Sequence, residues 1–141
     1  MNILIINGPN LNLLGTRDPE VYGQDTLEDI HTELEQQYPD HSFSFYQSNV
    51  EGELINRVQE AMDDQTDALI INPGGYSHTS VALRDALDAI TMPKVEVHLS
   101  NIHGREEFRD RSITGAVMNG IITGFGKHSY VLGVEAIERL N

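Results

Sequence analysis

A glutamate and a histidine stand two residues apart in a valine-rich stretch of the chain. Glu96 and His98 belong to the segment 94–98, which reads Lys-Val-Glu-Val-His. In a β-strand, side chains two positions apart point to the same face, so this carboxylate can orient this imidazole. A glutamate buried in such a strand needs a partner, and a partnered histidine at a strand end is suited to general acid or base chemistry. A histidine satisfied in the core beside a glutamate that reaches solvent is the alternative, and the pair alone does not decide between them.

A second group of polar residues lies in the segment 9–25, which shows no helical or strand periodicity. The segment carries Asn10, Arg17 and Tyr22 among several leucines. Connections of this length are uncommon in compact domains unless they cover a site or are disordered. Because a disordered segment would be poorer in leucine, we expect an ordered active-site loop built around Tyr22.

Other histidines suggest a metal site as a minor alternative. His78 and His103 could join His98 and Glu96 as ligands, but the spacing H-E-x-x-H is absent. The remaining histidines, His31, His41 and His128, are predicted to be surface residues without a role.

Several chemistries find no support in the composition. The chain has no cysteine, which excludes disulfides, thiolate nucleophiles and cysteine-bound metals. It also lacks the phosphate-binding motifs G-x-x-x-x-G-K-[ST] and G-x-G-x-x-G after the first apolar run, and the nucleophile motif G-x-S-x-G. We therefore expect an enzyme that uses no cofactor.

The net charge of −13 excludes two classes of partner. Nucleic acids and anionic membranes would both be repelled, and we expect neither as a partner. A small anionic substrate would be repelled as well, so a site for an acid must hold its own arginines. The N-terminal segment has no basic leader and no apolar run of membrane length, which predicts a cytoplasmic protein.

The elements that must position these side chains follow from an alternation of apolar runs and helical patterns, which is typical of βαβ units. Strands are expected at 3–6, 42–45, 68–71, 94–98 and 120–125, with about five helices. The helix that follows the first strand is expected over about 26–38, with a capping box at Thr26, and a later helix is expected to be capped by Thr79 or Ser80. Five parallel strands with right-handed crossovers most often take the order 2-1-3-4-5 of a flavodoxin-like α/β fold, with helices on both faces. Because no repeat or linker interrupts the pattern, residues 1–141 are expected to form a single catalytic domain.

Ligands of such sheets bind beyond the carboxyl ends of the strands, where the strand order reverses. Polar, turn-rich segments end the first, third and fourth strands, at 7–10, 72–78 and 96–101. Turn chemistry alone could explain any one of them. Their convergence at one edge of the sheet predicts that the site lies there.

Five stretches of the sequence together resemble the type II 3-dehydroquinate dehydratases. They are N-G-P-N-L-N-L-L-G-T-R at 7–17, V-Y-G at 21–23, Q-S-N with E-G-E-L at 47–54, N-P-G-G-Y-S-H-T-S-V-A-L-R-D-A at 72–86, and E-V-H-L-S-N-I-H-G-R-E-E-F-R at 96–109. The resemblance covers nearly the whole chain. It implies loss of water from 3-dehydroquinate to give 3-dehydroshikimate by anti elimination through an enolate, without metal or Schiff base, in the shikimate pathway or in quinate breakdown.

The resemblance also implies roles for single residues in the reaction. Tyr22, as a phenolate supported by Arg17, would remove a proton beside the ketone. A water held near Asn10 would stabilise the enolate. His98, oriented by Glu96, would protonate the departing hydroxyl.

For substrate binding, the resemblance implies that Asn72, His78 and Arg109 hold the hydroxyls and that the backbone amides of Leu99 and Ser100 hold the carboxylate. It implies that Asp85 reaches the site of a neighbouring subunit, within a homododecamer built of trimers. The chain departs from the family pattern at 110–113 and at Met118, where we expect consequences for subunit packing more than for chemistry. A non-catalytic module of the same fold is the rival hypothesis, and the presence of every matched residue argues against it.

Overall fold

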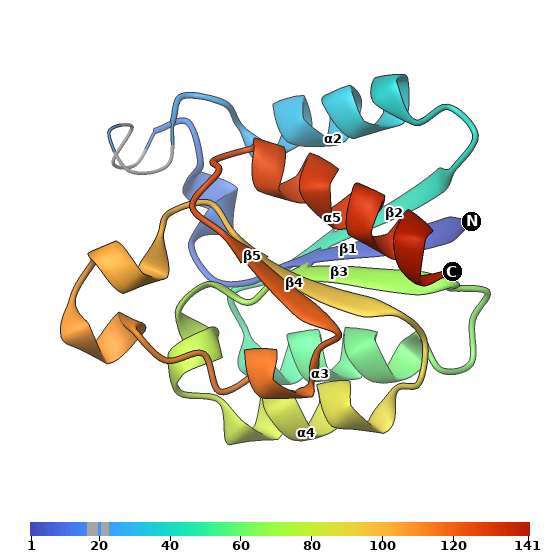
Figure 1. Cartoon of the computed structure of the whole chain (residues 1–141). Coiled ribbons are helices and arrows are strands. Elements are labelled where there is room, and N and C mark those ends of the chain that lie inside the picture. The colour runs from blue at the N-terminus through green and yellow to red at the C-terminus, as the bar shows by residue number, and fades with distance from the viewer. Residues whose placement is uncertain (17–19, 21–22) are drawn as a thin grey trace.

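Five parallel strands form one sheet in the order β2-β1-β3-β4-β5 (Figure 1). The structure is a computed structural model, and it describes all residues except 17–19 and 21–22. The strands are β1 (Asn2–Asn7), β2 (Ser42–Gln47), β3 (Ala68–Asn72), β4 (Lys94–His98) and β5 (Gly120–Thr123). The predicted order is thus confirmed. Strand β5 is shorter than expected because Gly124, at φ 99°, leaves the extended conformation.

Two helices cover each face of the sheet (Figure 1). On one face lie α2 (Leu27–Gln37) and α5 (His128–Leu140), and on the other lie α3 (Glu51–Glu60) and α4 (Val81–Ala89). These are the four α-helices of the described residues, where the sequence pattern predicted about five. The connection from β4 to β5, at 99–119, contains the short 3-10 helices η3 (Ile102–Gly104), η4 (Glu107–Arg109) and η5 (Gly115–Val117) and no α-helix.

The structure confirms the predicted N-terminal caps of two helices, α2 and α4. At α2 the side chain of Thr26 accepts a hydrogen bond from the Asp29 amide, and the Asp29 carboxylate accepts one from the Thr26 amide, which completes the capping box. At α4 the cap is Ser80, the second of the two candidates, whose hydroxyl accepts a hydrogen bond from the Leu83 amide at 2.9 Å.

The core consists of two apolar layers, one on each side of the sheet. Ile3 and Ile5 of β1 face the layer under α2 and α5, whereas Leu4 and Ile6 face the layer under α3 and α4. This alternation follows from the two-residue period of a strand. Because both faces are covered, a polar side chain on a central strand is either buried or at a strand end.

Two glycines let the segments after β1 and β3 lie against each other. A Cβ atom on Gly8 would lie 2.4 Å from the Pro73 carbonyl oxygen, so no larger residue fits there. Gly74 has φ +60° and packs against Pro9. The polar ends of two strands are thereby brought into contact at the edge where the sequence predicts a site.

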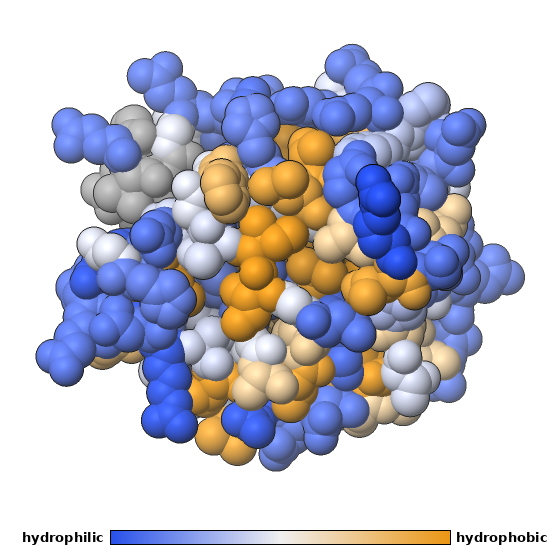
Figure 2. All heavy atoms as spheres, viewed as in Figure 1, coloured by the Kyte–Doolittle hydropathy of each residue, from blue (hydrophilic) through white to orange (hydrophobic). Residues whose placement is uncertain are grey.

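Apolar side chains gather on the surface over β5 and α5 (Figure 2). Exposed members are Ile121, Phe125, Leu132 and Leu140. Strand β5 is an edge strand, and Ile121 lies on it. In the part of the chain that the structure describes, no helix has the length and apolar character required to cross a bilayer.

His31 is not the surface residue that the sequence pattern predicts. It lies half-buried on α2, and its ring stacks on Phe45 of β2 with the ring centroids 3.7 Å apart. Its Nε2 atom is buried without a hydrogen-bond partner in the described structure. Burial lowers the pKa of His31 to about 4, because desolvation disfavours the imidazolium.

This histidine is expected to make the fold less stable in mild acid. An unfolded histidine titrates near pH 6.5, so between that pH and about 4 the unfolded chain binds a proton that the folded chain does not. The free energy of unfolding is therefore highest above pH 6.5, where neither state binds this proton, and it decreases as the pH falls toward 4. Since the ring is only half-buried, we expect a loss of about 1–2 kcal/mol. Urea unfolding at pH 7 and pH 4.5 measures it, and His31→Phe, which keeps the stacking, should lose less stability than the parent over this interval.

Candidate active site

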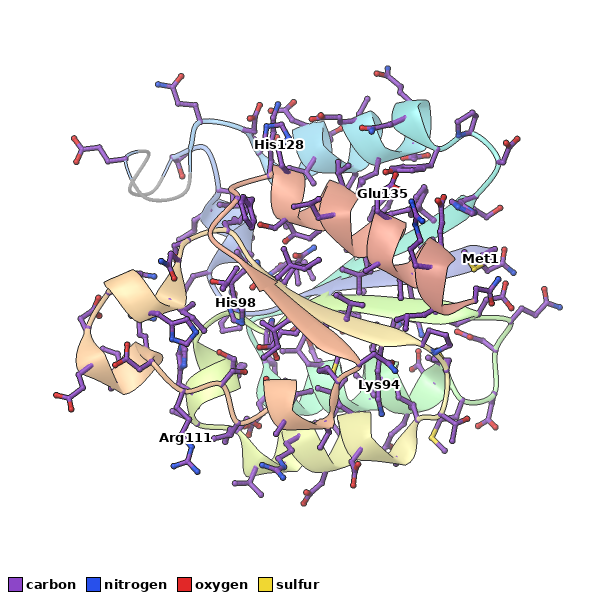
Figure 3. All side chains as sticks on the ribbon, in the orientation of Figure 1. Met1, Lys94, His98, Arg111, His128 and Glu135 are labelled. Carbon is purple, nitrogen blue, oxygen red and sulfur yellow. The ribbon has the colours of Figure 1, made fainter. Side chains whose placement is uncertain are left out.

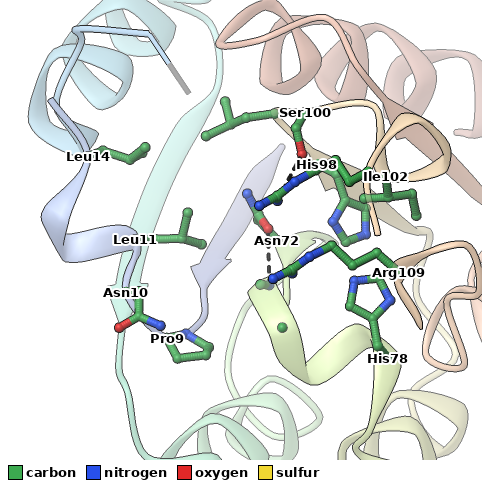
Figure 4. A pocket seen from close by; sticks show the side chains of 14 residues that line it. Pro9, Asn10, Leu11, Leu14, Asn72, His78, His98, Ser100, Ile102 and Arg109 are labelled. Carbon is green, nitrogen blue, oxygen red and sulfur yellow. Dashed lines mark hydrogen bonds between the residues drawn. The ribbon is translucent and has the colours of Figure 1, made fainter. Parts of the chain in front are cut away.

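A pocket opens beyond the carboxyl ends of β1, β3 and β4, at the edge of the sheet that the sequence predicts (Figure 4). Seven of the residues predicted for the site line it, namely Asn10, Asn72, His78, His98, Leu99, Ser100 and Arg109. They come from segments far apart in the sequence. The fold therefore brings together the polar groups that follow three different strands.

The apolar side of the pocket is built by the segment after β1. Leu11 begins the 3-10 helix η1 (Leu11–Leu13) and Leu14 follows it; both line the pocket and are buried in the core. Just before them, Asn10 has a positive φ of 69°, and its backbone amide donates to the Asn49 side chain at 2.9 Å. The described beginning of the predicted active-site loop is thus ordered against the core, with Asn10 at the pocket wall.

His98 and Glu96 form a buried pair at the end of β4. The Nε2 atom of His98 lies 2.7 Å from Oε2 of Glu96, and Glu96 is fully buried while His98 is 5% exposed. Lys94 begins the same strand and lies at its opposite end (Figure 3). Because an ionised carboxylate only accepts hydrogen bonds, Nε2 of His98 is the donor, and Nδ1 is the ring nitrogen left to exchange a proton with a ligand.

Two hydroxyl groups also contact Glu96, and sequence reasoning did not anticipate either. Ser112 donates to Oε2 at 2.5 Å, and Thr114 donates a short hydrogen bond to Oε1. Ser112 belongs to the segment 110–113, which we expected to affect subunit packing more than chemistry. Ser112 reaches Glu96 because the connection from β4 to β5 folds back against the strand that precedes it.

Asn72 is fixed in orientation from below the pocket. Its Oδ1 accepts a hydrogen bond from the Gly74 amide at 3.1 Å, and its Nδ2 donates to the Tyr130 hydroxyl at 3.2 Å. Tyr130 in turn donates a short hydrogen bond to Asn7. Burial raises the pKa of Tyr130, so this hydroxyl remains a neutral donor. The side chain of Asn72 is therefore presented to the pocket with little freedom to turn.

The opposite side of the pocket is basic. The rings of His78 and His98 lie with their centroids 6.3 Å apart, and Nδ1 of His78 lies 2.8 Å from the Arg111 carbonyl oxygen. Arg105 and Arg109 both line the pocket. An acidic protein thus places two guanidinium groups at one site, which suits an anionic ligand.

Arg105 is a pocket residue that the sequence prediction did not include. It lies four positions before Arg109, and its Nη1 is 3.5 Å from the Ser100 hydroxyl. Arg105 could have been predicted from the sequence, because a site for an acidic substrate in so acidic a chain must contain arginines. Glu106 lies between the two guanidinium groups, 2.9 Å from Nε of Arg109 and 3.8 Å from Nε of Arg105. The hydrogen bond from Arg109 lowers the pKa of Glu106, so this carboxylate stays charged and holds Arg109 in place.

Four predicted site residues are not among the described residues that line the pocket, and one of them is Glu96, which is fully buried and contacts His98. Tyr22 and Arg17 fall outside the described residues. Asp85 is exposed on α4 and does not line the pocket of its own chain. His103, proposed as a metal ligand in the minor alternative, is exposed and outside the pocket as well. Across residues 1–16, 20 and 23–141, no group of three or more histidine, aspartate or glutamate side chains is arranged to hold a metal ion.

Comparison with known proteins gives one consistent family. The family model "Dehydroquinase class II" matches residues 1–138. The 3-dehydroquinate dehydratase of Polynucleobacter asymbioticus is 56% identical over 137 residues, which cover 96% of this chain and 92% of the relative. That of Lachnoclostridium phytofermentans is 50% identical over 143 residues, which cover 100% of this chain and 99% of the relative. Among solved structures, the type II dehydroquinase from Butyrivibrio crossotus superposes with a TM-score of 0.95 at 42% identity and covers 98% of this chain and 97% of its own.

Proposed function

This chain belongs to the class II dehydroquinase family, and from that premise we propose how its pocket removes water from 3-dehydroquinate to give 3-dehydroshikimate in the shikimate pathway. The observation that carries the proposal is the pair of His98 and Glu96, which reaches a basic pocket at the ligand edge of the sheet. A rigid, partnered imidazole beside two arginines is suited to proton transfer on a small carboxylic acid.

The reaction begins with removal of a proton beside the ketone. We assign this step to Tyr22 as a phenolate, with Arg17 as the positive charge that supports it. The C–H electron pair moves onto the carbonyl oxygen, and a water held near Asn10 stabilises the enolate. The pair then returns, the C–O bond of the hydroxyl breaks, and His98 donates the proton that lets the hydroxyl leave as water. The two transfers leave Tyr22 protonated and His98 neutral, and exchange with solvent restores both.

The substrate is held by the basic side of the pocket. We assign its hydroxyls to Asn72, His78 and Arg109, and its carboxylate to the backbone amides of Leu99 and Ser100. The turn at Leu99 is supported by hydrogen bonds from the Gly126 amide to the Leu99 carbonyl at 2.9 Å and from Thr123 to the Ser100 carbonyl at 2.8 Å. A turn fixed through its carbonyls keeps its amides in one place, as preorganised binding requires.

The proposed enolate mechanism needs neither a Schiff base nor a metal. The chain has two lysines, and neither lines the pocket. Lys94 is buried at the other end of β4 and donates to the carbonyls of Leu87 and Ile90 at 2.6 and 2.8 Å. Lys127 is paired with Asp25 and Glu33. The same reaction would also serve quinate breakdown. A cytoplasmic location is part of the proposal, because a chain without cysteine gains nothing from an oxidising compartment.

The experiment that tests this function is incubation of the protein with 3-dehydroquinate while the conjugated enone product is followed by ultraviolet absorbance. Turnover is expected to survive exhaustive chelation and treatment with borohydride in the presence of substrate. Well-folded protein that forms no product would refute the proposed reaction. Covalent trapping by borohydride would refute the enolate route, and loss of activity with chelator would favour a metal-dependent lyase.

We further propose that the chain works as a homododecamer built of trimers, in which Asp85 completes the site of a neighbouring subunit. Asp85 is exposed on α4 and does not line the pocket of its own chain, so it is free to contact a neighbouring subunit. The apolar side chains exposed over β5 and α5 form a surface that contact with another subunit would bury (Figure 2). Light scattering gives the mass of the assembly.

Shared sites predict that Asp85→Ala raises KM for 3-dehydroquinate severalfold, because a side chain that helps to bind the substrate in the neighbouring subunit is lost. The matched control is Asp88→Ala, which removes an exposed aspartate from the same helix. Steady-state kinetics of both variants measure the effect. An unchanged KM in Asp85→Ala would count against sharing.

A further inference from the structure

The Glu96 carboxylate is enclosed by more donors than the catalytic pair requires. It is fully buried, and its register partners on the neighbouring strands are Ile71 of β3 and Ile121 of β5. Oε2 accepts hydrogen bonds from both His98 and Ser112, and Oε1 accepts one from Thr114. Both oxygens are therefore held, and the plane of the carboxylate is fixed.

The hydroxyl of Ser112 is itself held in position. Its oxygen accepts a hydrogen bond from the Gly115 amide at 3.0 Å, so its hydrogen is directed to Glu96. The backbone of this segment is attached to the neighbouring part of the site, since the Ile113 amide donates to the Ser77 carbonyl at 2.7 Å. The Thr114 side chain is fully buried. Both hydroxyls are thus parts of a rigid turn, and neither is a surface group that swings into place.

These hydroxyls stabilise the ionised form of a carboxylate that has been removed from water. Burial among isoleucines favours the protonated acid, whereas each donated hydrogen bond favours the anion. Only the anion accepts the hydrogen bonds of all three donors without having to donate one itself, and only the anion balances the charge of the His98 imidazolium. A protonated Glu96, or one turned away, would make His98 harder to protonate.

We propose that Ser112 and Thr114 are positioning residues for the dehydration: they hold the Glu96 carboxylate ionised and aimed at His98, and so keep His98 protonated for delivery to the leaving hydroxyl. The inference rests on the proposed function of His98 as the general acid. Among the described residues that line the pocket with His98, the other titratable or charged side chains are Arg105, Arg109 and His78, which ends the 3-10 helix η2 (Gly74–His78). None of these three side chains is an acid, so Glu96 is the carboxylate that the described structure pairs directly with His98.

The test removes one hydroxyl at a time. Thr114→Val keeps the shape of the side chain, and Ser112→Ala removes the second donor. Each variant is expected to lower kcat roughly 10- to 100-fold, the effect of one hydrogen bond to a charged group, with little change in KM. The alkaline limb of the kcat profile should move to lower pH, because His98 loses its proton more readily. Thr114→Ser, which keeps the hydroxyl, should recover most of the activity.

A control separates positioning from loss of stability. Ser80→Ala removes a buried hydroxyl that caps α4 and contacts neither Glu96 nor His98, and it is expected to lower the melting temperature without shifting the pH profile. If Thr114→Val does not fold, Ser112→Ala provides the same measurement through the other hydroxyl. A folded variant with parental kcat and an unmoved alkaline limb would overturn the proposal.

A readout without turnover distinguishes this proposal from the proposed function. Nitrogen NMR of His98 follows its protonation in the resting protein, and Thr114→Val should lower the pH at which His98 titrates. If the parent protein failed to convert 3-dehydroquinate, this shift would still report whether the hydroxyls control the pair. An identical titration in parent and variant would refute the positioning role even in an active enzyme.

Discussion

His98→Gln is expected to lower kcat by about 10²- to 10⁴-fold, the contribution of a positioned general acid. Glutamine places an amide N–H near the position of Nε2, so Glu96 keeps a donor and the buried carboxylate is not left unpaired. What is lost is the group that delivers a proton to the departing hydroxyl. Absorbance of the enone product measures kcat, and thermal unfolding is expected to change little because the variant preserves the hydrogen bond that Glu96 receives at 2.7 Å.

His103→Gln is the matched control, because His103 is exposed in the connection that follows β4 and does not line the pocket. Its kcat should equal that of the parent. A His98→Gln variant with nearly parental kcat would assign the proton transfer to another group, and His78 would be the next candidate, since its ring lies 6.3 Å from that of His98.

The sheet was predictable because its strands carry local signals. Residues 3–6 and 68–71 are continuous apolar runs, as strands buried on both faces must be, and each is fully buried in the structure. The start of α2 was predictable because Thr26 and Asp29, three positions apart in the sequence, have the residue types of a capping box. The pair of Glu96 and His98 was predictable for the same reason, since a strand places every second side chain on one face.

The contacts that sequence reasoning missed are those made across long separations by segments without periodicity. Ser112 and Thr114 lie 16 and 18 residues from Glu96, in a connection whose path depends on hydrogen bonds such as that from Ile113 to Ser77. No periodic pattern in the sequence indicates which strand such a turn will pack against. The burial of His31 could not be predicted for the same reason, because its ring on α2 is covered by the Phe45 ring on β2.

Tyr22→Phe is expected to abolish measurable turnover, because it removes the oxygen that accepts the proton beside the ketone. A tyrosine titrates near pH 10, so a useful phenolate population at neutral pH needs a shift of about two to three units, or roughly 3–4 kcal/mol of stabilisation. Guanidinium groups are the natural source of that stabilisation, and no cysteine or pocket-lining lysine offers a substitute base. The melting temperature should stay close to that of the parent, since the substitution keeps the aromatic ring.

The base and acid roles can be separated by hydrogen exchange in heavy water. If Tyr22 forms the enolate and His98 acts afterwards, His98→Gln should still exchange a proton beside the ketone of 3-dehydroquinate, although it releases little product. Tyr22→Phe should exchange that proton no faster than buffer does, and NMR of the substrate measures both rates. Exchange that persists in Tyr22→Phe and disappears in His98→Gln would reverse the assignment, and would make the histidine that Glu96 holds at 2.7 Å the base. The variant that retains exchange therefore identifies the residue that acts in the second step. It also shows whether the Glu96 carboxylate supports His98 as an acid or as a base.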